Sequence, residues 1–235
     1  MQSQPVHHFE TSPPIHWLVL LAVFTICFAT GLVADDSLVQ TNAAEIAAVK
    51  QAAQKALKEL FLPRAEINKK SYGFEDNDVV ADAALKPPVE LFILDDKRVL
   101  AYQSGQPVSS LLKPTGQWFV PVAIGGTNRA MIQVTQTATN KWTGSGWGWT
   151  PLARDWQSIK KWWPASGGFT PLFIISPPMA GYYFTVPQVQ PANLTPFMSP
   201  QSAIAAKDGP PPALDDASQT IQGIRQVLVQ RKKEP

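Results

Sequence analysis

The side chains that carry most enzyme chemistry are concentrated at the amino-terminal end of this chain. All three histidines, His7, His8 and His16, and the single cysteine, Cys27, lie there. The long remainder therefore offers no Ser-His-Asp or Cys-His nucleophile and none of the usual zinc sites. A glycine-rich run at residues 144–148 lacks the lysine and the strand-to-helix setting of a phosphate-binding loop. We expect no enzyme activity.

Carboxylates are the other candidates for chemistry. Residues 75–82, EDNDVVAD, alternate carboxylates as a calcium loop does, but they lack the glycine that such a loop needs for its sharp turn. We expect a solvated turn in which Asn77 or Asp78 caps a short helix. Glu90 and Asp95 could cleave a glycoside as a pair, although nothing in their spacing singles them out. The sequence predicts no catalytic residue, metal or cofactor.

A membrane anchor is the most specific feature of the chain. Residues 15–34, IHWLVLLAVFTICFATGLVA, contain no charged side chain and have the length of a bilayer-spanning helix. The preceding tail, 1–14, has no Lys or Arg, which a cleavable signal peptide would carry, so we expect a retained single-pass transmembrane helix. His16 at the membrane edge fits an interfacial belt, and ligation of a tetrapyrrole or metal by His16 is the alternative.

The orientation of this anchor is coded weakly, because the nearest basic residue is Lys50. We place the tail in the cytoplasm and the long carboxy-terminal part on the periplasmic, extracytoplasmic side of the inner (cytoplasmic) membrane. One span followed by a long domain is the common layout of an exported, anchored protein. The net charge of +2 and the pI near 8.6 are too mild for a nucleic-acid surface.

The elements after the anchor predict a small α+β domain. Apolar residues recur at spacings of three and four over 41–62, which predicts a helix. It would be about 30 Å long, enough for a helical stalk. We expect this helix to pack on its own domain, and pairing with a partner helix is the alternative.

The domain itself is expected over residues 66–186. Short apolar runs separated by turn residues predict three β-hairpins: 89–94 with 99–103, 118–124 with 129–137, and 169–175 with 182–186. One amphipathic helix, begun by Thr150 and Pro151 and ended by Pro164, is expected between the last two hairpins.

Three tryptophans lie outside any helical period. Trp142, Trp147 and Trp149 are surrounded by Gly, Ser and Thr, so we expect a flexible loop that carries large apolar rings. Each ring has about 150 to 250 Å² of surface to bury. The rings need a partner, a ligand, or a fold-back onto the domain.

A Pro-rich arm, 187–213, is expected to follow the domain and to end in a short helix over 214–233. The arm contains an Asn193-Leu194-Thr195 triplet that fits a glycosylation acceptor. The helix is weakened by Gly223, so we expect it to dock on its own domain or on another chain. Its apolar stripe consists of Leu214, Ala217, Ile221, Ile224 and Leu228.

These features favour a non-catalytic accessory or assembly subunit of a larger energy-transducing or envelope complex. Its partners would be other membrane protein subunits and the lipid bilayer, with no nucleic acid. The alternative is an anchored periplasmic binding module whose exposed tryptophans bind cell-wall glycan or another ligand. The partner-binding residues expected under the first function are Trp142, Trp147, Trp149, Leu214, Ile221, Ile224 and Leu228.

Overall fold

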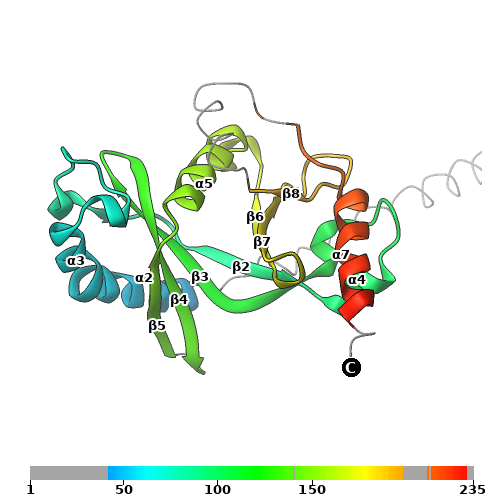
Figure 1. The fold of residues 1–235 in the computed structure, drawn as a ribbon, viewed down its shortest axis with the longest axis horizontal. Helices are drawn as coiled ribbons and strands as arrows, with labels where there is room; N and C mark the ends of the chain where they lie inside the picture. Colours follow the sequence, from blue (N-terminus) through cyan, green and yellow to red (C-terminus); the bar gives the residue numbers. More distant parts are fainter. Residues whose placement is uncertain (1–41, 140, 198–210, 212, 232–235) are drawn as a thin grey trace, which may run out of the picture. The chain divides into compact units, whose positions relative to one another are not determined.

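A mixed, eight-stranded sheet forms the centre of the described structure (Figure 1). The computed structural model describes residues 42–139, 141–197, 211 and 213–231. They belong to one compact unit, Thr41–Pro235, whereas the other unit, Met1–Gln40, lies wholly outside the described residues. The predicted tail, transmembrane segment and His16 therefore lie outside them as well. Within the described part, the predicted α+β class is confirmed.

The strands follow the order β5-β4-β3-β2-β6-β7-β8, and β1 also pairs with β3. Neighbouring strands are antiparallel except β2 and β6, which run parallel. The bounds are β1 (Ala84–Leu85), β2 (Val89–Leu94), β3 (Leu112–Ile124), β4 (Thr127–Ala138), β5 (Lys141–Gly148), β6 (Leu172–Ser176), β7 (Gly181–Thr185) and β8 (Thr195–Pro196).

Helices cover both faces of this sheet. The alternation of side chains along β3 shows the two faces, because Trp118 packs under the amino-terminal helices and Phe119 packs under the helix Thr150–Trp162. The helices are α2 (Ala43–Ala56), α3 (Leu62–Ile67), α4 (Asp96–Ala101), α5 (Thr150–Trp162) and α7 (Ala217–Arg231). A π-helical turn, Leu57–Phe61, joins α2 to α3, and short 3₁₀ turns lie at Lys70–Tyr72, Val80–Asp82, Val108–Leu111, Ala165–Gly167 and Pro177–Met179.

The helix predicted over 41–62 is present, and its apolar side lies on β4 and β5. The helix therefore packs on its own domain, as we expected from the sequence. The π-helical turn adds a residue to one turn and shifts the buried stripe by one position, so Leu60 is 38% exposed although the regular period predicted it to be buried. The buried residues along the helical segment are Val49, Ala53, Ala56, Leu57, Phe61 and Ala65.

Two of the three predicted hairpins are confirmed. β3 and β4 are joined by Gly125 and Gly126, whose φ angles of 56° and 85° suit a tight two-residue turn. β6 and β7 form the last predicted hairpin. The first prediction is wrong, because α4 occupies most of 99–103. Asp95 begins this helix as its N-cap, with Oδ1 accepting hydrogen bonds from the backbone N–H groups of Lys97 and Arg98 at 3.0 and 3.1 Å.

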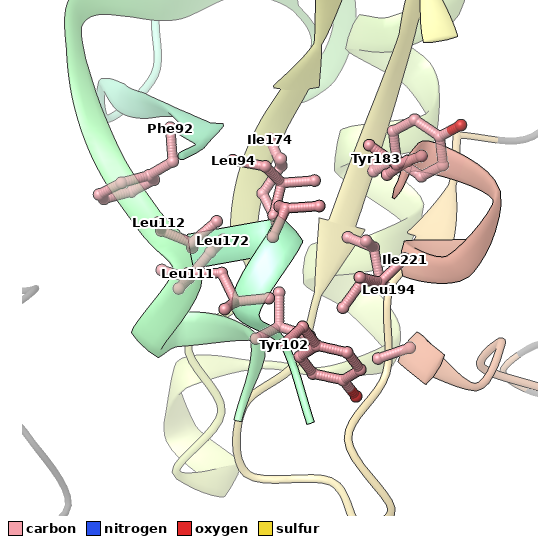
Figure 2. Close-up of a cluster of buried hydrophobic side chains, with 14 of the residues drawn as sticks. Phe92, Leu94, Tyr102, Leu111, Leu112, Leu172, Ile174, Tyr183, Leu194 and Ile221 are labelled. Atoms are coloured by element: carbon pink, nitrogen blue, oxygen red, sulfur yellow. The ribbon is translucent and has the colours of Figure 1, made fainter. Parts of the chain in front are cut away.

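The carboxy-terminal helix α7 packs on its own domain (Figure 2). Its side chains join Leu94 of β2, Tyr102 after α4 and Ile174 of β6 in one buried cluster. This cluster lies on the same sheet face as α2, because Glu90 pairs with Trp118 and Phe92 follows Glu90 by two residues along β2. The apolar stripe predicted for α7 is thus a core stripe, with Ala217, Ile221, Ile224 and Leu228 all buried.

The segment predicted as an extended arm begins inside the core. Asn193 is 2% exposed, and its side chain donates hydrogen bonds to the carbonyls of Val186 and Val189 and accepts one from the N–H of Val186. Its amide is therefore not accessible to a glycosylating enzyme in the folded chain. Thr195 Oγ1 accepts a hydrogen bond of 2.9 Å from the backbone N–H of Asp215, so Thr195 and Asp215 are held side by side.

Candidate functional site

Trp142 and Trp147 lie on strand β5, where the sequence predicted a flexible loop. Both rings are half-buried against the apolar cluster beneath α2 and α3. They share one sheet face although they are five residues apart, because Ser145 forms a bulge between the pairs Val134–Gly144 and Gln133–Gly146. The rings thus fold back onto the domain, which is one of the alternatives that the sequence left open.

Trp149 lies on the opposite face of the sheet. Its φ of 51° places it in the left-handed region just before α5, and its ring centroid lies 5.0 Å from that of Phe119. Gly146 makes room for this ring, because a Cβ on Gly146 would approach the indole of Trp149 to 2.8 Å. The three predicted tryptophans therefore form two separate groups rather than one aromatic surface.

An arginine accompanies the first of these groups. The guanidinium carbon of Arg64, on α3, lies 4.7 Å from the ring centroid of Trp147, which is a cation–π contact. Arg64 is exposed, and Trp142 and Trp147 keep part of their rings in water. Tryptophan and arginine are the side chains most often found at the energetic centres of protein interfaces. Arg64, Trp142 and Trp147 form what we call the Arg–Trp patch.

The other predicted partner-binding residues are covered by the domain itself. Ile221, Ile224 and Leu228 are buried beneath α7, and Leu214 packs against the cluster under α5. The structure does not bring them together with the tryptophans. While α7 stays docked, Ile221, Ile224 and Leu228 offer no surface to another chain, whereas Leu214, which precedes α7, stays partly exposed.

The outward side of α7 forms a groove that the sequence analysis missed. This groove, of about 730 Å³, lies between α7 and residues 102–104, which follow α4. Its lining includes Gln222, Gln226 and Gln230, which recur every fourth residue on one face of the helix. That spacing was visible in the sequence, but the other wall comes from a segment more than a hundred residues away.

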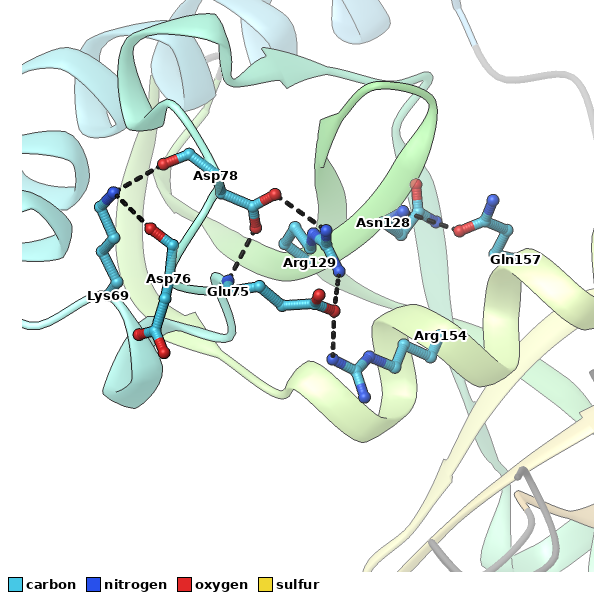
Figure 3. A network of polar contacts seen from close by, with 8 residues as sticks. All are labelled: Lys69, Glu75, Asp76, Asp78, Asn128, Arg129, Arg154 and Gln157. Atoms are coloured by element: carbon cyan, nitrogen blue, oxygen red, sulfur yellow. Dashed lines mark hydrogen bonds and ion pairs between the residues drawn. The ribbon is translucent and has the colours of Figure 1, made fainter.

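Arg129 binds two carboxylates of the acidic segment 75–82 (Figure 3). Arg129 Nη1 donates to Glu75 Oε1 at 2.6 Å, and Nη2 donates to Asp78 Oδ1 at 2.8 Å. Asp78 Oδ2 also accepts the backbone N–H of Glu75. The 3₁₀ turn at Val80–Asp82 has no side-chain cap, so the predicted capping role of Asp78 is replaced by this ion pair. The described residues contain no group of three potential metal ligands.

The carboxylate pair considered for glycoside cleavage is separated by the fold. Glu90 and Asp95 lie at opposite ends of β2, about 16 Å apart at the usual rise of a strand. Glycosidases need about 5 to 9.5 Å between their two carboxyl groups. Asp95 is engaged as a helix cap, and the N–H of Arg98 lowers the pKa of its carboxyl.

Two carboxyl groups, those of Glu90 and Asp155, titrate near neutral pH. Burial, with a smaller contribution from the nearby Glu45, raises the pKa of Glu90 to about 7. Burial alone raises the pKa of Asp155, on α5, to about 6. Glu90 faces Trp118 across the pairing of β2 and β3, and the indole N–H of Trp118 is buried without a hydrogen-bond partner. A single proton-exchanging carboxyl without a second group does not make an acid–base site.

The described part of the chain contains no helix that is both long and apolar enough to cross a bilayer; residues 15–34 lie outside it. Comparison with protein-family models, with curated proteins and with solved structures finds no match to this chain.

Proposed function

We propose that this protein is a membrane-anchored, non-catalytic accessory or assembly subunit of a larger membrane protein complex. The observation that carries the proposal is the short distance in sequence between the apolar segment 15–34 and a helix that is fixed on the sheet. Asn42 caps α2, with its Oδ1 accepting the N–H of Ala44 at 3.0 Å. Only residues 35–41 lie between the proposed span and this cap.

This spacing limits how far the domain can move from the bilayer. Seven residues with their flanking bonds reach at most about 25 to 30 Å when fully extended. Because the apolar side of α2 packs on β4 and β5, the helix does not act as a hinge. Under this proposal the partners of the domain would be other membrane subunits and the bilayer.

The Arg–Trp patch is the part of the domain best suited to such a partner. Half-buried aromatic rings beside a guanidinium lose little conformational entropy on binding, because their own domain already restricts them. The patch also lies on β5 and α3, at the edge of the sheet. We place it on the periplasmic side of the inner membrane, as the domain following a single span.

Purification of the tagged, full-length chain in mild detergent tests this function. We expect a stoichiometric set of membrane proteins to co-purify, identified by mass spectrometry. Arg64→Glu should reduce their recovery, and Lys50→Glu, which reverses a charge on exposed α2 surface, should not. Deletion of residues 187–235 is unsuitable as a test, because it removes α7 and Asn193 from the core.

Two results would count against the proposal. One is recovery of the wild-type chain as a monomer without other membrane proteins. The other is a change of tryptophan fluorescence on addition of peptidoglycan fragments, which would favour the glycan-binding alternative. A periplasm-dependent reporter fused to the carboxy terminus checks the orientation, since it is active only if the domain is exported.

A further inference from the structure

The groove beside α7 has polar groups at its amino-terminal end that are partly satisfied by one another. Ser218 Oγ lies 3.2 Å from Tyr102 Oη and 3.0 Å from Ser104 Oγ. Each hydroxyl has one donor and two acceptor positions, so these three hydroxyls retain capacity for further hydrogen bonds. Tyr102 is 7% exposed, which fixes this end of the groove to the core.

The helical wall of the groove carries amide groups with no partner in the described part of the chain. Gln222, Gln226 and Gln230 are exposed, and no hydrogen bond from their side chains occurs among the described residues. Four residues of helix rise about 6 Å. An extended strand repeats its backbone groups on one side every two residues, or about 6.6 Å. The flexible glutamine side chains can absorb this small difference.

One charge lies within the groove. Arg225 lines it between the glutamines, makes no ion pair in the described part of the chain, and is the one charged residue of the lining. An arginine that makes no ion pair attracts an anionic group, and its guanidinium can bind a carboxylate through two hydrogen bonds. The groove therefore has charge complementarity to an acidic ligand.

We infer that this groove binds an extended, carboxylate-bearing peptide segment of a partner subunit. The side-chain amides of Gln222, Gln226 and Gln230 would form hydrogen bonds with the backbone of the segment. Arg225 would bind an Asp or Glu side chain of the segment. A neighbouring apolar side chain of the segment would cover Val229, which is 43% exposed. From Ser218 to Gln230 the helix rises about 18 Å, the length of five or six extended residues. This inference rests on the proposed function, because it names the segment by which a partner is held.

A glycan fits the lining less well. Sugar rings are usually bound by stacking on an exposed aromatic face, and the one aromatic residue of the lining, Tyr102, has its ring buried. Regularly spaced amides that each offer a donor and an acceptor match a peptide backbone instead.

Titration of the purified full-length chain in detergent with acetyl-(Thr-Glu)3-amide tests the inference without requiring the native complex. We expect saturable binding that falls about tenfold for Arg225→Glu and several-fold for Gln226→Ala. Arg225→Lys should keep part of the affinity. Lys50→Glu, on α2 and outside the groove, should bind as the unaltered chain does. Acetyl-(Thr-Lys)3-amide should not bind.

Several outcomes would overturn the groove assignment. These are the absence of saturable binding up to about 1 mM, equal binding by Arg225→Glu, or tighter binding of N-acetylglucosamine oligomers than of the acidic peptide. If the chain co-purifies with membrane subunits but does not bind the peptide, the proposed function stands and the groove assignment is wrong. If the chain binds the peptide but purifies alone, the groove binds acidic peptides and the proposed function is wrong.

Discussion

Gly144 of β5 lies directly against Ala56 of α2. A Cβ on Gly144 would collide with the Cβ of Ala56, so the helix can cross the strand at this distance only because residue 144 has no side chain. This crossing is the point at which the helix that follows the proposed anchor is fixed to the sheet. It sits beside the π-helical turn, which begins at Leu57.

Gly144→Ala should therefore destabilise the domain by about 1 to 3 kcal/mol, the usual cost of overpacking. The measurement is the free energy of unfolding from urea denaturation followed by tryptophan fluorescence. Ala56→Gly removes the colliding methyl group, so the double variant should recover part of the loss. If the two changes are simply additive, Gly144 and Ala56 do not make this contact.

Gly223→Ala should have the opposite effect. A Cβ at this position of α7 would meet no atom within 4 Å, and Gly223 lies in the interior of the helix. The substitution should stabilise α7 by up to about 1 kcal/mol, because alanine restricts the unfolded backbone more than glycine does. Unchanged or lower stability in urea denaturation would mean that something covers this side of the helix.

Arg129→Met should cost about 3 to 5 kcal/mol, because it leaves the buried carboxylate of Asp78 without its cation. The matched control is Lys70→Met, which breaks a contact of 3.1 Å between Lys70 and Asp76 whose side chains are about three-quarters exposed. That change should cost less than about 1 kcal/mol. Urea denaturation of both variants measures the difference, and equal costs would show that Arg129 is not a structural clamp.

The stability of the domain should fall as the pH rises from about 4 to 6. Asp155 is 5% exposed, and its carboxyl has a pKa of about 6 in the folded chain against 3.8 when unfolded. Between these values the folded state holds a proton that the unfolded state has released, so each step up in pH disfavours folding. The full effect is about 3 kcal/mol at most. Asp155→Asn should remove the part of this slope that Asp155 contributes.

Glu90 supplies the control for that measurement. Its carboxyl titrates at about 7 when folded and 4.5 when unfolded, so its contribution is lost over a higher pH range. Glu90→Gln should remove the slope that persists between about pH 4.5 and 7 in Asp155→Asn. A pH-independent stability in the unaltered chain would contradict both assignments.

Elements with an unbroken period were predictable from the sequence. The Gly125-Gly126 pair predicted the turn of the β3–β4 hairpin. The apolar stripe of Ile221, Ile224 and Leu228 predicted the buried side of α7. Each depends on residues close together in the chain, so local pattern was enough.

Elements with an inserted residue were not predictable. The bulge at Ser145 reverses the alternation along β5, so Trp142 and Trp147 share a face that strict alternation forbids. The π-helical turn does the same to the helix that begins at Ala43. Asp95 suited both a hairpin turn and a helix cap, and only the packing of Val99 and Tyr102 in the core separates the two. The groove depends on contacts between distant segments, which no local pattern contains.

The hydrogen bond between Asp215 and Thr195 has a practical consequence for work on this chain. Because Thr195 and Asp215 are neighbours in space, a cut in the chain between them would leave two new ends that start close together. The same geometry makes the chain a candidate for splitting into two fragments that reassemble around α7.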